Sequence, residues 1–341
     1  DWRAGYGPIA HRSETIERMQ ALVQRLVAQR RIADEASAHA LLAAADRVAC
    51  TAMSVVAHMT YARRIDRSGC PLGSDDFKQT PEGHTGGSLN MVPAFVGYLL
   101  ANALTGTTRG WLMGQGHCVA AIEAVNALTG DVSAAQRGRY DRSEAGLSRL
   151  IADFYSYAID KQGRPAVPLG SHAGPNTAGA ISEGGYLGFA GLQYVHTPLP
   201  GESLVAFLSD GAFEEQRGSD WAPRWWRAED CGFAIPVMIL NGRRIEQRTQ
   251  IVQEGGATWL AEDLRHNGFD PVIVDGRDPM AIAWAIVEAE DTLSAFAARS
   301  DRRYPVKLPY VIAETEKGFG FPGAATNAAH NLPLDGNPRE D

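Results

Sequence analysis

Short runs of consecutive apolar residues recur along most of the chain, and each ends at turn-forming or charged residues. These runs are RGWLMG (109–114), LVAFLSDG (204–211), IPVMILNG (235–242), PVIVDG (271–276) and LPYVIAE (308–314). They lack the apolar–polar alternation of a half-exposed strand, which is typical of strands covered on both faces. Helical stretches with apolar residues three and four apart separate them. The pattern predicts an α/β fold, a parallel sheet covered by helices on both faces.

The expected helices form an N-terminal group and a group that alternates with the strands. Residues from about 13 to 64 contain mostly good helix formers and predict helix throughout, before a loop rich in Gly, Pro and Asp at 68–87. We therefore expect a helical N-terminal extension at 1–75 and an α/β domain at 76–341. Further helices are predicted at MVPAFVGYLLANAL (91–104), CVAAIEAVNAL (118–128), GLSRLIADFYSYAI (146–159), WLAEDLRH (259–266) and PMAIAWAIVEAEDTLSAFAARS (279–300).

Composition narrows the range of functions only slightly. The 341 residues are 45% apolar and include 32 basic and 40 acidic side chains, a formal charge of −8. Without a basic block, this charge argues against a nucleic-acid partner. No apolar run approaches the roughly 20 residues that span a bilayer, so no membrane segment is expected. Four scattered cysteines and the lack of a signal-peptide pattern favour a cytoplasmic protein with reduced thiols.

The two ends of the sequence lead us to expect part of a longer protein or assembly. The sequence begins on Asp1 rather than on methionine, and it ends in DGNPRED, a composition typical of a linker. We therefore expect either a fragment of a longer protein or one subunit of an assembly.

Oxygen-bearing side chains follow two of the predicted strands. Asp210-Gly211 ends one apolar run and Asn241-Gly242 ends the next, with one crossover between them. Neighbouring parallel strands would bring these ends close together, at the edge where α/β folds bind ligands. A carboxylate, an amide oxygen and a nearby main-chain carbonyl suit Mg²⁺ or Ca²⁺, and Mg²⁺ commonly recruits phosphate oxygens. The alternative is that Asp210 caps a helix and that Asn241 lies in a turn.

A glycine-rich stretch, GQGHCVA (114–120), follows one predicted strand and opens a helix. It imitates the dinucleotide-binding pattern, but Val119 stands where the third glycine belongs, so a nicotinamide site is disfavoured. Four of the nine histidines lie in loops rich in glycine or turn-forming residues, namely His84, His117, His172 and His330. Each could be structural alone, but together they predict a shared cleft where imidazoles bind phosphate or move protons.

Several of these stretches together resemble the N-terminal, diphosphate-binding half of phosphoketolases, within the transketolase-like enzymes that use thiamine diphosphate. SDG followed by LNG is similar to the family's diphosphate motif of GDG and LNG. The other similar stretches are EGHTGGSLN (82–90), GQGHC (114–118), GSHAGPNTAGAISEGGYLG (170–188), and ETEKGFGFPG (314–323) with AAHNLPL (328–334). The resemblance implies a fold of the diphosphate-binding type.

The resemblance also implies a metal and a cofactor. Asp210, Asn241 and the main-chain carbonyl of Arg243 would hold Mg²⁺. Gly185 and Gly211 would line the diphosphate of thiamine diphosphate.

For catalysis, the resemblance implies that His84, His117, His172 and His330 face the thiazolium and the sugar phosphate. His117 would also bind the cofactor. Lys317 would lie near the phosphate of the substrate.

The implied activity is cleavage of the C2–C3 bond of a ketose phosphate such as xylulose 5-phosphate. With inorganic phosphate as co-substrate, it would give acetyl phosphate and an aldose phosphate. The resemblance implies a homo-oligomer and a pyrimidine-binding domain, absent from this sequence, that supplies an activating glutamate. Without that domain the chain is expected to be inactive.

Five residues depart from the family pattern. They are Ser209, Ala212, Ser182, Thr85 and Tyr186. GHTGGSLN also leans toward the transketolase motif. Two alternatives therefore remain: a transketolase-like subunit that transfers a two-carbon unit, and a non-catalytic relative that binds or scaffolds.

Overall fold

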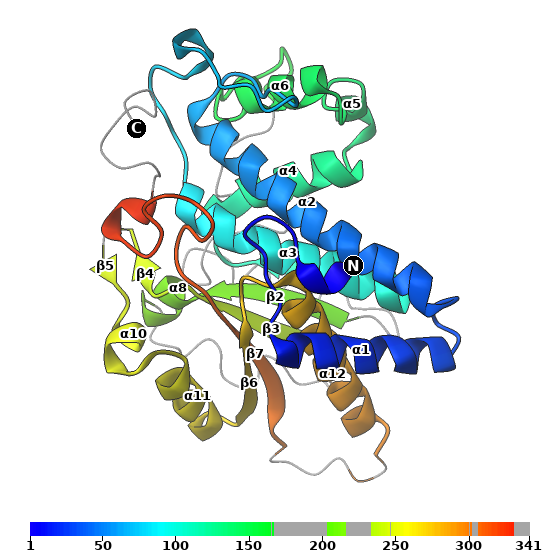
Figure 1. Ribbon diagram of the computed structural model, residues 1–341. Helices are drawn as coiled ribbons and strands as arrows, with labels where there is room; N and C mark the ends of the chain where they lie inside the picture. Colours follow the sequence, from blue (N-terminus) through cyan, green and yellow to red (C-terminus); the bar gives the residue numbers. More distant parts are fainter. Residues whose placement is uncertain are drawn as a thin grey trace.

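The central feature of the computed structural model is a sheet of five parallel strands (Figure 1). The structure describes residues 1–164, 166, 203–215, 233–245, 247–299, 301 and 306–330. The strand order is β1-β2-β3-β7-β6. The strands are β1 (Gly110–Met113), β2 (Ser203–Ser209), β3 (Phe233–Leu240), β6 (Phe269–Asp275) and β7 (Leu308–Glu314). These are the five apolar runs of the sequence, so the predicted α/β fold with a parallel sheet is confirmed.

The pairing register places the carboxyl ends of the strands at one edge. β2 pairs with β3 from Ser203 opposite Phe233 to Ser209 opposite Ile239. β3 pairs with β7 up to Leu240 opposite Glu314. The residues that follow β2, β3 and β7 therefore emerge side by side.

Helices surround the sheet, and most lie near their predicted positions. α3 and α12 contact β3, whereas α11 contacts β6 and β7. The α-helices are α1 (Ser13–Ala28), α2 (Glu35–Tyr61), α3 (Thr85–Thr105), α4 (Val119–Thr129), α5 (Ala134–Arg137), α6 (Glu144–Asp153), α8 (Asp210–Glu215), α10 (Gln250–Glu254), α11 (Gly256–His266) and α12 (Pro279–Ala297). Shorter elements are the 3₁₀ turns η1 (Trp2–Ala4), η2 (Ser74–Asp76), η3 (Gly116–Cys118) and η8 (Asn327–His330), and the hairpin of β4 (Arg243–Arg244) and β5 (Gln247–Arg248).

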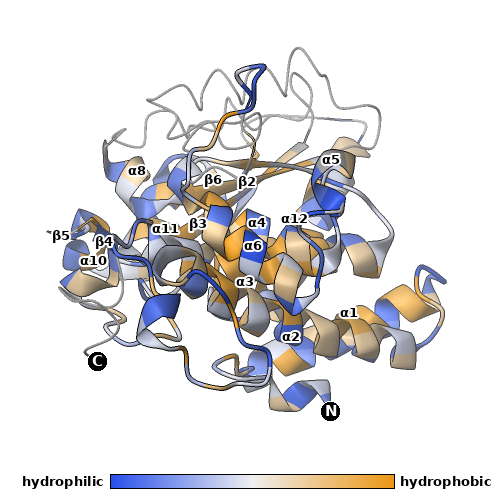
Figure 2. Cartoon of the chain, turned by 90° about the horizontal axis from the view of Figure 1, so that it is seen from above, coloured by the Kyte–Doolittle hydropathy of each residue, from blue (hydrophilic) through white to orange (hydrophobic). Residues whose placement is uncertain are grey.

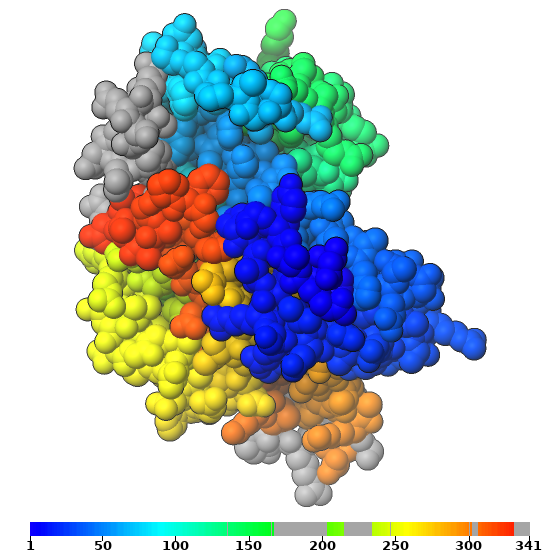
Figure 3. All heavy atoms as spheres, viewed as in Figure 1, coloured from blue at the N-terminus to red at the C-terminus, as the bar shows by residue number. Residues whose placement is uncertain are grey.

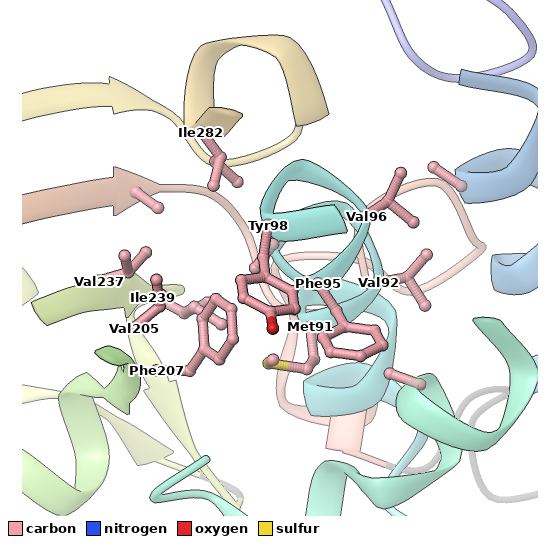
Figure 4. Packing of buried hydrophobic residues seen from close by; sticks show 14 of the residues in the cluster. Met91, Val92, Phe95, Val96, Tyr98, Val205, Phe207, Val237, Ile239 and Ile282 are labelled. Carbon is pink, nitrogen blue, oxygen red and sulfur yellow. The ribbon is translucent and has the colours of Figure 1, made fainter. Parts of the chain in front are cut away.

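Helix α3 lies at the centre of the core because it is apolar on every side. Its residues from Thr85 to Tyr98 are all buried. Figure 4 shows Tyr98 of α3 beside Phe207 of β2, and the rings of Tyr98 and Phe207 have centroids 6.2 Å apart. Hydrophobic residues gather where α3, α4 and α12 meet the sheet (Figure 2). A helix that is apolar all round is expected in the core of a large domain.

The N-terminal region departs from the predicted continuous helix. α1 ends before Gln29 and α2 begins at Glu35. Arg30 has a positive φ of 58°, and the carboxylate of Asp34 accepts a hydrogen bond from the backbone N–H of Ser37. The predicted helical region from about 13 to 64 is therefore confirmed, but as two helices, because a left-handed residue and an N-cap separate them.

A second helix is shorter than predicted. The stretch 146–159 was expected to be helical throughout, but α6 ends at Asp153. Tyr155 and Tyr157 both have positive φ, which a right-handed helix does not allow. That part of the prediction is wrong.

The N-terminal helices share the core of the α/β region. α1 contacts α12, and α2 contacts α3, α4 and α6. Figure 3 shows the first residues (blue) beside the segment at 306–330 (red), where Gly320 lies close to Pro8. The boundary at residue 75 stays a prediction.

Among the described residues, two helices are long and apolar enough to cross a membrane by length and composition, contrary to the expectation that no segment comes near this length. They are α2 and α3, and the most apolar windows of these helices are 44% and 78% buried inside the structure, respectively. The packing of α3 against the sheet accounts for its apolar sequence.

Candidate active site

A cavity of about 280 Å³ opens at the carboxyl edge of the sheet. The carboxyl ends of β1, β2 and β3 and the loops after them line it with residues 114–118, 209–212, 241 and 243–245, and Lys317 lines it just beyond β7. The start of α3 and the end of η8 complete the wall. Ligands of α/β proteins bind at this edge, because the strands here end in loops rather than in continued sheet.

Asp210 lies at the inner wall of the cavity, directly after β2. It is 1% exposed, and it accepts hydrogen bonds from the backbone N–H groups of Gly211 (3.0 Å) and Gly242 (2.7 Å). The hydroxyl of Thr249 donates a third, at 3.3 Å. Burial raises the pKa of Asp210 to about 7, although the two backbone donors act in the opposite direction. A carboxyl in this setting is ready to exchange its proton for a cation.

Asn241 follows the neighbouring strand β3, and it lies beside Asp210. The bond from Gly242 N–H to Asp210 joins the two strand ends directly. The side-chain oxygen of Asn241 accepts a hydrogen bond from the backbone N–H of Arg243 (3.0 Å), and its amide donates to Asn90 (3.3 Å). The structure therefore brings together Asp210, Asn241 and Arg243, which the sequence predicted as a metal-binding group.

Glycines at the two strand ends allow this close approach. Gly242 has a positive φ of 76°, which a residue with a side chain adopts only with strain. A Cβ on Gly211 would lie 3.1 Å from the Cβ of Arg244. The main chain can therefore face the cavity without side chains in the way.

Three of the four predicted histidines meet in this cavity. The rings of His84 and His117 have centroids 5.1 Å apart, and those of His84 and His330 are 5.2 Å apart, both edge to face. Burial lowers the pKa of His330, and the charge of Lys317 lowers it further. His330 is therefore largely neutral at pH 7 and can accept a proton. The fourth histidine, His172, lies outside the described residues, as does Gly185.

Lys317 reaches the same cluster from the end of β7. Its Nζ lies 3.4 Å from Nδ1 of His330, and the residue is 5% exposed. Burial lowers the pKa of Lys317. A close backbone contact positions this segment, since a Cβ on Gly86 would lie only 1.6 Å from the carbonyl oxygen of Ala329. Gly86 is thus required where the start of α3 meets η8.

Some residues of the cavity were not predicted from the sequence. The side-chain amide of Gln115 is buried and donates to the carbonyl of Leu208 (3.4 Å), which connects the loop after β1 to β2. The side chains of Arg243 and Arg244 also line the cavity. The sequence did offer a signal for these two arginines, because they directly follow LNG (240–242), a loop that was already expected at the site.

The departures from the family pattern fall partly inside the cavity. Ser209 and Ala212 line it, and Thr85 is buried at the first residue of α3. Ser182 and Tyr186 lie outside the described residues. Within the described part of the chain, no group of three or more His, Cys, Asp or Glu side chains could hold a metal ion. A site built from one carboxylate, one amide and one carbonyl does not need such a group.

A family model described as the XFP N-terminal domain matches residues 37–340. The chain belongs to the phosphoketolase N-terminal domain family. This membership confirms the resemblance drawn from the sequence motifs. Phosphoketolases and transketolases belong to the enzymes that use thiamine diphosphate, so the match implies this cofactor class for the family.

Similar curated proteins bear the name probable phosphoketolase. The one from Streptomyces coelicolor is 32% identical over 216 residues, which cover 57% of this chain and 25% of that protein. That from Pseudomonas putida is 26% identical over 290 residues, covering 77% and 35%, respectively. That from Mycolicibacterium paratuberculosis is 28% identical over 287 residues, covering 77% and 34%. This phosphoketolase N-terminal domain thus spans about a third or less of the relatives' length.

A solved structure shares the fold. The crystal structure of a transketolase mutant from Pichia stipitis matches with a TM-score of 0.50 and 18% identity, covering 84% of this chain and 38% of the other. The likeness supports the diphosphate-binding type of α/β fold with helices at its N-terminal part.

Proposed function

We propose that this phosphoketolase N-terminal domain is the diphosphate-binding half of an enzyme that cleaves the C2–C3 bond of ketose phosphates. Xylulose 5-phosphate and inorganic phosphate would be its substrates, and acetyl phosphate and an aldose phosphate its products. The observation that carries the proposal is the adjacency of Asp210 and Asn241 at the carboxyl edge of the sheet, inside a cavity with three histidines. Family membership supplies the cofactor class.

The residues at this edge fit a Mg²⁺ ion that carries a diphosphate. Asp210 has no ion-pair partner among the described residues, and its buried carboxyl has a raised pKa, so a divalent cation would compensate its charge. Each of its oxygens accepts a backbone hydrogen bond, yet a carboxylate offers about four acceptor positions, so capacity remains. Asn241 and the carbonyl of Arg243 would complete the protein ligands.

Thiamine diphosphate, when bound, would supply the carbanion chemistry that carbon–carbon cleavage needs. The histidines of the cavity would hold the substrate hydroxyls and move protons. His330 suits proton acceptance, because burial and Lys317 favour its neutral form. Lys317 would attract the substrate phosphate.

The remaining partners and the location are the expectations drawn from the sequence and its family resemblance. A pyrimidine-binding domain or subunit would bring the activating glutamate, and the assembly would be a homo-oligomer in the cytoplasm. Thiamine diphosphate would then bind between this chain and that domain.

Calorimetric titration of thiamine diphosphate with Mg²⁺ tests the proposal. Asp210→Asn keeps the shape of the side chain but removes its charge, so cofactor binding should fall by at least about a hundredfold. Asp270→Asn is the matched control, because Asp270 is exposed on β6. Unchanged cofactor affinity in Asp210→Asn would refute the metal role.

Product analysis separates the candidate functions. Acetyl phosphate formed from xylulose 5-phosphate and phosphate would support the phosphoketolase reaction, whereas transfer of two carbons to ribose 5-phosphate would support a transketolase. Ser209 and Ala212 line the cavity in place of the residues of the family motif, and this observation favours the third candidate, a non-catalytic relative. No cofactor binding, even with the partner domain present, would support that candidate.

A further inference from the structure

A buried asparagine of helix α3 connects the end of β3 to the segment that follows β7. Asn90 is 1% exposed and lies among the apolar residues of α3. Its side-chain nitrogen donates hydrogen bonds to the carbonyl of Glu316 (2.7 Å) and to the hydroxyl of Thr315 (3.3 Å). Its side-chain oxygen accepts a hydrogen bond from the amide of Asn241 (3.3 Å). Both ends of this buried amide are therefore satisfied, as burial of a polar group requires.

The direction of these hydrogen bonds is determined from both ends. A backbone carbonyl only accepts, so the carbonyl of Glu316 must face the nitrogen of Asn90. The oxygen of Asn90 then faces Asn241, and it requires the nitrogen of that amide. At the other end, the backbone N–H of Arg243 only donates, so it requires the oxygen of Asn241 (3.0 Å). Both ends thus assign the same orientation to the amide of Asn241.

The orientation of this amide decides what Asn241 can bind. Asn241 lines the cavity next to Asp210. An amide oxygen is a good ligand for a divalent cation, whereas the NH₂ group only donates hydrogen bonds and would repel a cation. A half-turn of the amide would therefore replace a ligand with a repulsive group. Arg243 uses one of the two acceptor positions of the oxygen, which leaves the second for a cation.

We propose that Asn90 is a positioning residue that holds the amide of Asn241 with its oxygen available to a divalent cation. Groups that orient a metal ligand commonly change the affinity for the metal about ten- to hundredfold. A purely structural Asn90 would instead connect α3 to Thr315 and Glu316, without any effect through Asn241. The inference rests on the proposed function, because that function places a cation at Asp210 and Asn241.

Binding of Mn²⁺ to the full 341-residue chain tests the inference, with and without thiamine diphosphate. Mn²⁺ prefers the same oxygen ligands as Mg²⁺, and electron paramagnetic resonance measures the unbound ion. Asn90→Leu should weaken Mn²⁺ binding about ten- to hundredfold. In the Asn241→Ala background the same change should alter the affinity by less than about twofold, because the ligand that Asn90 positions is absent. Asn102→Leu is the matched control, because it makes the same change about 18 Å further along α3.

A second variant separates the two sets of contacts and keeps the test decisive if Asn90→Leu does not fold. Asn90→Asp retains an oxygen for the amide of Asn241 but lacks the NH₂ group that bonds to Thr315 and Glu316. It should therefore keep most of the Mn²⁺ affinity of the unmodified chain. The same change in the Asn241→Ala background measures what the added carboxyl group contributes by its charge alone.

Several outcomes would overturn the inference. An equal loss from Asn90→Leu with and without Asn241→Ala would show that Asn90 acts through the fold, as would a loss in Asn90→Asp as large as that in Asn90→Leu. Mn²⁺ affinity of Asn90→Leu within about twofold of the unmodified chain would contradict any positioning role. Absence of Mn²⁺ binding by the unmodified chain, even with thiamine diphosphate present, would also overturn it. If Mn²⁺ binding depends on Asn90 but thiamine diphosphate does not bind, the proposed function alone is refuted.

Discussion

Replacing His11 with glutamine should reduce the free energy of unfolding by about 3–5 kcal/mol, as expected when one partner of a buried ion pair is removed. His11 lies between two carboxylates, with Nε2 3.0 Å from Asp46 and Nδ1 3.0 Å from Asp278. The three side chains are at most 2% exposed. Asp46 belongs to α2, and Asp278 caps α12 by accepting a hydrogen bond from Met280 N–H (2.8 Å). The cluster therefore connects the N-terminal segment to helices α2 and α12.

The charge of His11 determines the pH dependence of this effect. Burial lowers its pKa, but the carboxylates of Asp278 and Asp46 outweigh burial and raise the pKa to about 10. Because this folded-state pKa lies above the unfolded value of about 6.5, His11 stabilises the fold fully below pH 6.5. That stabilisation is lost as the pH rises toward 10.

Urea unfolding at pH 6, 8 and 10 measures both effects. The unmodified protein should lose stability across this range more steeply than His11→Gln. His39→Gln is the control. His39 lies in α2, and its ring centroid is 5.8 Å from that of Trp2, much as the ring of His11 is 6.2 Å from Trp2. Asp46→Asn combined with His11→Gln should recover part of the loss, since one buried charge is then removed. A loss under about 1 kcal/mol in His11→Gln would refute the reasoning, because a buried carboxylate pair without its cation should cost more.

Gly86→Ala should weaken the binding of thiamine diphosphate with Mg²⁺ in calorimetry, because the added Cβ would clash with the carbonyl of Ala329. Gly138→Ala is the control, because the space around Gly138 is open. Equal cofactor affinity of the two variants would contradict the effect of the clash. Cofactor affinity should fall as the pH decreases from 8 to 6, since protons compete with the metal for Asp210, whose pKa is about 7. The chain alone should form no acetyl phosphate, and adding the proposed pyrimidine-binding domain should allow the reaction. Turnover by the chain alone at the rate of a complete enzyme would disprove this.

The parallel sheet could be predicted because its three inner strands, β2, β3 and β7, are buried on both faces. Residues 204–208 and 235–240 are almost continuously apolar, a pattern that few other elements share. The proximity of Asp210 and Asn241 then followed from topology, because one crossover between parallel strands brings their carboxyl ends together. The roles of the histidines and of Lys317 depended on the family resemblance, and they stay predictions.

Features formed by residues far apart in the sequence could not be predicted in this way. His11, Asp46 and Asp278 meet only after α2 and α12 have packed, and no local pattern relates them. The break between α1 and α2 was different, because Asp34 followed by Glu35 is an N-cap signal that helix propensity concealed.

The hairpin with Arg243 and Arg244 could be predicted only in part. Strands of two residues are too short to show any periodicity, so the sequence indicated the loop but not the direction of its side chains. The direction of these side chains decides their contacts, because a shift of one residue would exchange the two arginines between Gly211 and Asn327. The main chain and the side chain of Arg243 therefore have separate contacts: its carbonyl would bind the metal, whereas its guanidinium donates a hydrogen bond to Asn327. Substitutions that retain the backbone but change this side chain would therefore leave the proposed metal ligand in place.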